Sequence, residues 1–147
     1  MSASLLELVI PASVSIVIAC GTVIWTTVSN RRLEDKKIRS TKKEEIYSLF
    51  LRKLSFIYTL HIDEYKGSMK YMNIAKSLIN ENDEITLKIT LLSRLYFPEL
   101  DGADLIDSNF YTSYLIKDIA SGRVLSEDRY TTTMNSLNKL VDKTLKL

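Results

Sequence analysis

The sequence predicts an all-α protein, with one N-terminal transmembrane helix followed by a small antiparallel helical bundle in the cytoplasm. Three observations lead to this fold class. Gly and Pro are scarce, at 4 and 2 of 147 residues, whereas sheets with tight turns need both. Residues 9–28 carry no charge, and the later residues repeat apolar side chains at three- and four-residue steps. We therefore expect three parts: a transmembrane segment at 1–30, a basic segment at 31–45 and a bundle at 46–147.

The uncharged stretch has the length of a transmembrane helix. Its 20 residues, VIPASVSIVIACGTVIWTTV, would rise about 30 Å as an α-helix, which matches the hydrocarbon core of a bilayer. Its hydroxyl groups can bond back to the helix backbone, and Trp25 suits the headgroup boundary. A secretory signal would begin with basic residues, but MSASLLEL has none. The remaining alternative is a buried helix of a soluble domain, which the basic cluster directly after the stretch disfavours.

That basic cluster sets the predicted orientation. Glu34 and Asp35 stand against seven Lys and Arg residues, which leaves a net charge of +5 over residues 31–43. Positive residues stay on the cytoplasmic side, so we expect the N-terminus outside and the bundle inside, at the plasma (inner) membrane. The cluster either binds anionic lipid headgroups or only fixes this topology. Its members are Arg31, Arg32, Lys36, Lys37, Arg39, Lys42 and Lys43.

Small side chains within the uncharged stretch predict a surface for helix packing. They are Ala12, Ser15, Ala19 and Cys20, and Ser15 and Ala19 form a small-xxx-small pair that lets helices approach closely in lipid. Cys20 is the one cysteine of the chain, which excludes an internal disulfide. In apolar surroundings we expect its thiol to pack as a small hydrophobic group.

The first two bundle helices follow from apolar spacing. The second covers 69–79, after a turn at Gly67 and Ser68. The first is predicted from one face made of Ile46, Leu49, Phe50, Leu54, Ile57, Leu60 and His61. NEND at 80–83 predicts a break, with Asn82 or Asp83 as the cap of the next helix.

The segment 84–97 fits either a helix or a half-buried strand. We expect a helix, because the chain offers no convincing partner strand and a lone strand leaves its edges unpaired. Pro98 closes this helix, and the next covers Ala103 to Ala120, ending at Ser121 and Gly122. Ser126 is predicted to cap a final helix that runs to about residue 145.

Chemical motifs are sparse. His61 is the one histidine, and His61, Asp63 and Glu64 do not match a di-metal bundle, which needs two Glu-x-x-His motifs. The sequence contains no glycine-rich phosphate loop and no nucleophile elbow. We therefore expect no catalytic residue, no metal and no cofactor. The net charge of +2 also gives no reason to expect a nucleic acid as partner.

The predicted function is to hold a protein partner at the membrane surface. We expect a non-enzymatic protein that anchors, scaffolds or regulates a membrane-associated complex, with the bilayer and a protein (a second copy or another subunit) as partners. The eight tyrosines either pack at the core edge or form a contact surface. The alternative is a small self-oligomerising membrane effector of the pore-forming, toxin or phage-exclusion type. An enzyme with an unrecognised site is the least favoured reading.

Overall fold

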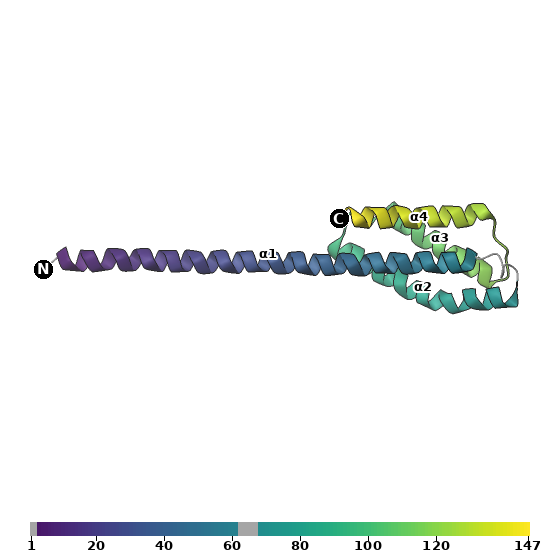
Figure 1. Ribbon diagram of the computed structural model, residues 1–147, viewed down its shortest axis with the longest axis horizontal. Coiled ribbons are helices and arrows are strands. Elements are labelled where there is room, and N and C mark those ends of the chain that lie inside the picture. The colour runs from purple at the N-terminus through teal and green to yellow at the C-terminus, as the bar shows by residue number, and fades with distance from the viewer. Residues whose placement is uncertain (1–2, 62–67) are drawn as a thin grey trace. The chain divides into compact units, whose positions relative to one another are not determined.

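The computed structural model describes residues 3–61 and 68–147, with side-chain surroundings from residue 18 onward. Within these ranges the chain forms helices and no strand, which confirms the all-α class (Figure 1). The chain divides into two compact units, Met1–Ser40 and Thr41–Leu147. The helices are α1 Ala3–His61, α2 Met69–Tyr96, α3 Ala103–Ala120 and α4 Glu127–Leu145.

The first unit consists of the N-terminal part of α1. Its described side chains, from Ile18 to Ser40, are all exposed. The hydroxyls of Thr22, Thr26 and Thr27 each donate to the carbonyl oxygen four residues earlier, at 2.8 Å. This is the back-bonding that the sequence predicted, and it keeps these polar groups satisfied within the helix itself.

The predicted transmembrane span is not found. In the part of the chain that the structure describes, no helix is both long enough and apolar enough to cross a bilayer. The predicted location, a single-pass protein of the plasma (inner) membrane with its N-terminus outside and its bundle in the cytoplasm, is therefore wrong.

The second unit is an antiparallel helical bundle, as the sequence predicted, but its described residues form four helices, whereas the sequence predicted five. Hydrogen bonds fix the directions of its helices. Lys43 Nζ donates to the carbonyl of Leu145 at 3.1 Å, and the Tyr130 hydroxyl donates to the carbonyl of Leu60 at 2.9 Å. The part of α1 that opens the second unit thus meets the end of α4, and the end of α1 meets the start of α4.

The same reversal holds for each successive pair of helices, because residues early in one contact residues late in the next (Figure 1). Short connections between neighbours favour this up-and-down order. The contacting pairs are Lys53–Thr86 and Leu60–Tyr71 for α1 and α2, Asn82–Ser113 and Arg94–Asp101 for α2 and the start of α3, and Asp104–Lys139 and Asp118–Arg129 for α3 and α4.

The core draws apolar side chains from every helix of the bundle. Each large one that is removed from water contributes about 1.5–3 kcal/mol of hydrophobic stabilisation. On α1 the buried positions follow the face that the sequence predicted, with Leu49 and Leu54 at its edge. The fully or nearly fully buried apolar residues are Ile46, Phe50, Phe56, Ile57, Leu60, Tyr71, Ala75, Ile85, Ile89, Leu92, Phe97, Leu100, Leu105, Leu115, Ile116, Ile119, Ala120, Leu125, Tyr130, Leu137, Leu140 and Val141.

The predicted bounds of α3 are confirmed, and a C-terminal cap explains its end. Gly122 has a φ of 89°, which an L side chain rarely adopts. Its N–H donates to the carbonyl of Ile119 at 2.9 Å, and the N–H of Arg123 donates to the carbonyl of Asp118 at 3.1 Å. This pair of bonds is a Schellman motif. A Cβ on Gly122 would also lie 3.1 Å from Met72 Sδ, so packing adds a second reason for glycine.

The predicted break at 80–83 is wrong. α2 continues through it as one helix, and Asn82 is buried rather than capping a new helix. Its side chain donates to the hydroxyl of Ser113 on α3 at 3.0 Å, so a tertiary bond replaces the expected cap. The helix favoured for 84–97 is confirmed as far as Tyr96.

The remaining predicted helix starts are confirmed. Ser68 is the N-cap of α2, where its hydroxyl accepts from the N–H of Tyr71 at 3.1 Å, whereas Gly67 lies outside the described residues. Ser126 is the N-cap of α4 with an extended backbone, although its hydroxyl makes no capping bond.

Candidate functional site

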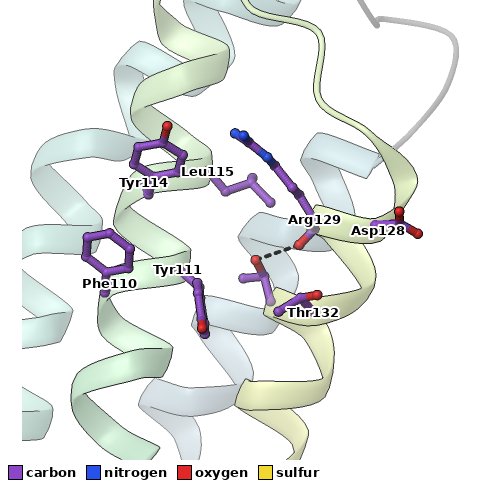
Figure 2. Close-up of a pocket in the computed structure, with 8 residues that line it drawn as sticks. Phe110, Tyr111, Tyr114, Leu115, Asp128, Arg129 and Thr132 are labelled. Atoms are coloured by element: carbon purple, nitrogen blue, oxygen red, sulfur yellow. Dashed lines mark hydrogen bonds between the residues drawn. The ribbon is translucent and has the colours of Figure 1, made fainter.

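A groove between α3 and α4 has exposed aromatic side chains along one wall. Its volume is about 290 Å³, and aromatic rings from α3 face polar side chains from α4 across it (Figure 2). The eight lining residues are Phe110, Tyr111, Tyr114 and Leu115 on α3 and Asp128, Arg129, Thr132 and Thr133 on α4.

Three rings on α3 form one continuous aromatic surface, which we call the ring cluster: Phe110, Tyr111 and Tyr114. Phe110 and Tyr114, one helical turn apart, are stacked with centroids 5.8 Å apart and an interplanar angle of 16°. Phe110 also meets Tyr111 edge-on at 5.9 Å. The three residues are 62%, 38% and 42% exposed. Contiguous exposed apolar surface of this kind marks interaction sites in soluble proteins.

Arg129 places a cation over the ring cluster. Its Cζ lies 5.4 Å from the centroid of the Tyr114 ring, within the range of a cation–π contact. Its Nη1 donates to Oδ2 of Asp118 at 3.0 Å, which restrains the guanidinium. Its backbone carbonyl accepts from the hydroxyl of Thr133 at 2.8 Å, the dashed line in Figure 2. The groove therefore offers aromatic faces beside an ordered cation.

Asp118 anchors this end of the groove. The residue is buried, and its other oxygen, Oδ1, accepts from Arg123 Nη1 at 2.9 Å. Two guanidinium groups therefore share one carboxylate, and they tie the end of α3 to the following loop and to α4. Charge-assisted bonds of this kind are about twice as strong as neutral ones. The groove thus has a rigid end, which lowers the entropy cost of binding a ligand.

A buried lysine occupies the middle of the bundle. Lys53 is completely buried, and its Nζ donates to Thr86 Oγ1 at 2.7 Å and to Asn109 Oδ1 at 2.6 Å. Burial lowers the pKa of Lys53 to about 7, and the charge of Asp83 opposes that shift. Lys53 does not line the aromatic groove. Lys53 thus links α1 to α2 and α3 through hydrogen bonds within the core.

Sequence reasoning missed Lys53, although a signal was present. The buried positions of this part of α1 include 46, 50, 57 and 60, and residue 53 completes their alternating steps of four and three. A polar residue in that register lies on the core face of the helix. The groove has no local sequence signal, because its two walls lie on different helices and residues 128–133 are remote in the chain from residues 110–115.

The predicted membrane-surface residues do not form one uniform surface. Five of them lie exposed on α1 in the first unit: Arg31, Arg32, Lys36, Lys37 and Arg39. Lys42 and Lys43 belong to the second unit and are partly buried. Lys42 Nζ lies 2.7 Å from Glu45 Oε2, a bond that raises the pKa of Lys42, and Lys43 donates to Leu145. Binding of anionic headgroups by the cluster stays a prediction.

The predicted helix-packing residues are only partly described. Ala19 and Cys20 are exposed on α1. Ala12 and Ser15 lie outside the residues whose side chains are described. The structure therefore leaves their association as a prediction.

His61 has a structural partner. Its Nε2 is 2.7 Å from Glu127 Oε1, and its ring meets Tyr130 edge-on at 4.9 Å. Among the described residues, no group of three or more His, Cys, Asp and Glu side chains could hold a metal ion. Asp63 and Glu64 lie outside that description.

Comparison with protein-family models, with curated proteins and with solved structures finds no match to this chain.

Proposed function

We propose that this protein is a non-enzymatic interaction module, whose bundle binds a partner polypeptide in the groove between α3 and α4. The observation that carries the proposal is the ring cluster, because three adjacent aromatic rings remain exposed although the core below them is filled. Tyr and Arg are enriched among the residues that dominate the binding energy of protein interfaces. Through this contact the chain would scaffold or regulate a larger protein assembly.

The chemistry of the groove favours an amphipathic peptide segment as the occupant. The ring cluster offers apolar area for one anchoring side chain, and the opposite wall offers Arg129, Asp128 and Thr132 as hydrogen-bonding groups. Asp128 and Arg129 have opposite charges, so the groove has no single sign of charge that would select a purely acidic or purely basic ligand. A segment with one apolar face and one polar face satisfies both walls.

The choice of a non-enzymatic role rests on the sequence and on His61. The sequence has no recognisable nucleophile or metal motif, and the one histidine is bonded to Glu127 outside the groove. Acid–base catalysis needs a titratable group aimed at a substrate site. We interpret the titratable side chains that line the groove, among them Asp128, as recognition groups.

The test compares the partners captured by three forms of the tagged full-length chain. These are the wild type, a Phe110→Ala/Tyr114→Ala variant, and an Ile106→Ala variant as matched control, since Ile106 is exposed on α3 but does not line the groove. Quantitative mass spectrometry should show a partner that is lost from the double variant and retained by the control. Thermal melts should show that all three are folded.

A direct measurement completes the test. Peptides that tile the captured partner are titrated into the wild type, and one segment should bind at least ten times more weakly to the double variant, about 1.4 kcal/mol. The proposal fails if no partner separates the double variant from the control. It also fails if the binding segment has equal affinity for both.

A further inference from the structure

The outer face of α2 carries a row of exposed leucines that the aromatic groove does not use. Leu87, Leu91 and Leu95 are 62%, 51% and 71% exposed. They recur at steps of four, so they lie on one side of the helix. The opposite side of α2 holds the buried residues, among them Ile85, Ile89 and Leu92. α2 therefore has one apolar face in the core and a second, narrower one toward solvent.

Two opposite charges flank Leu87 and Leu91 at equal distances along the chain. Glu84 precedes Leu87 by three residues, and Arg94 follows Leu91 by three residues. Both are exposed. The positions 84, 87, 91 and 94 follow the alternating steps of three and four that form a coiled-coil seam. Read in either direction, this seam has a charged residue, two leucines and a charged residue of opposite sign.

That symmetry identifies the occupant. If a second α2 lies antiparallel on the seam, Leu87 faces Leu91 of the second copy, and Glu84 faces Arg94 of the second copy. The two-fold axis then repeats both contacts, as an isologous interface requires. A parallel pairing would instead place each charge opposite its own kind, which is destabilising. Charge complementarity thus favours a second copy in the antiparallel orientation.

We propose that two copies of this chain pair through the seam Glu84–Leu87–Leu91–Arg94 of α2, antiparallel and about a two-fold axis. Leu95 flanks the seam and extends its apolar area. Arg94 also pairs with Asp101 of its own chain at 3.4 Å, but its side chain stays 67% exposed and can bond a second carboxylate. One helix pair is a small interface, so the dimer should depend on concentration.

The test is sedimentation velocity of the full-length chain over a range of concentrations. The wild type should pass from monomer to dimer as the concentration rises. Leu91→Glu should remove the dimer. The single variants E84R and R94E each place like charges at both ends of the interface, so each should weaken self-association at least ten-fold.

Mixing the two single variants provides the sharpest outcome. An E84R chain is positive at both ends of the seam and an R94E chain is negative at both ends, so an equimolar mixture should recover a dimer of one copy of each. A variant that failed to fold would not recover. The double variant E84R/R94E restores opposite charges within one chain and should dimerise like the wild type. Asp107→Arg, an exposed charge reversal on α3, is the control and should leave the dimer unchanged.

Three results would overturn the proposal. The first is a chain that stays monomeric at every concentration. The second is a dimer that persists in Leu91→Glu, which would assign association to another surface. The third is a mixture of the two single variants that fails to recover, which would exclude the antiparallel register.

Discussion

Lys53 and Asp118 are both buried charged residues of the same bundle, yet their surroundings differ. Lys53 donates to two neutral oxygens, on Thr86 and Asn109, and among the described residues no carboxylate pairs with it. Asp118 accepts from two guanidinium groups, those of Arg123 and Arg129, whose outer parts reach solvent. Removing a charge from water costs several kcal/mol unless a partner compensates it. The charge of Asp118 is therefore compensated by its partners, whereas the charge of Lys53 is not.

The less stable of these two regions is the polar layer around Lys53. On α2 and α3, Asn82 Oδ1 and Ser108 Oγ are also buried and have no hydrogen-bond partner among the described residues. Unsatisfied polar atoms of this kind cost about 1–3 kcal/mol each. The middle of the bundle, where α1, α2 and α3 meet, is thus stabilised less than the apolar packing around it suggests. The Asp118 end, beside the groove, is fully bonded.

The largest expected effect is a gain of stability with rising pH, caused by Lys53. The pKa of this residue is about 7 in the folded chain and 10.5 when it is free. Between these values the unfolded chain binds one more proton than the folded chain, so the free energy of unfolding rises with pH. The slope is at most about 1.4 kcal/mol per pH unit. Urea denaturation at pH 7, 8 and 9 measures it.

Lys53→Met is the matched variant for that experiment, because methionine has a similar length and no charge. It should flatten the pH dependence and raise the free energy of unfolding at pH 7 by about 1–3 kcal/mol, since no ammonium is then buried. Lys88→Met changes an exposed lysine on α2 and should have little effect. If the free energy of unfolding of Lys53→Met rises with pH as steeply as that of the wild type, Lys53 is not the cause of the slope, and the proposed difference between the two buried charges is wrong.

A smaller effect is expected at Asp118. Asp118→Asn keeps the shape but replaces two charge-assisted bonds, and it should lower the free energy of unfolding by about 1–2 kcal/mol. The loss is limited because Arg123 and Arg129 can turn to water. Chemical denaturation at neutral pH measures the change, with Asp107→Asn on the exposed side of α3 as control. A loss no larger than that of the control would show that the buried pair contributes nothing.

The smallest effect belongs to Asp104, which is bonded to Lys139 and Lys143 on the surface. These two bonds lower the pKa of Asp104 from 3.8 to about 2. The stabilisation is therefore present above pH 3.8 and is lost as the pH falls through 2. Thermal melts should show Asp104→Asn slightly below the wild type at pH 5, and the difference should shrink at pH 2 and vanish below it. A difference that is unchanged at pH 2 would mean that the charge of Asp104 is not its cause.

Much of the bundle could be predicted from local sequence alone. The face of α1 from Ile46 to Leu60, the bounds of α3 and the start of α4 after Ser126 follow from apolar spacing and from helix-end signals. The predicted break near Asn82 was wrong because its side chain bonds to Ser113, which is 31 residues away. A local signal for a cap cannot anticipate a partner at that distance.

The sequence by itself determined the all-α class, the antiparallel order and most of the core, because these depend on the period of apolar residues within each helix. It did not determine the location, because the predicted transmembrane span is not found in the part of the chain that the structure describes. Only the tertiary structure decided that Lys53 bonds to Thr86 and Asn109, that Asp118 is shared by two arginines, and that the ring cluster faces α4. Each of these depends on which helix surfaces meet, and that is set by the packing of the whole bundle.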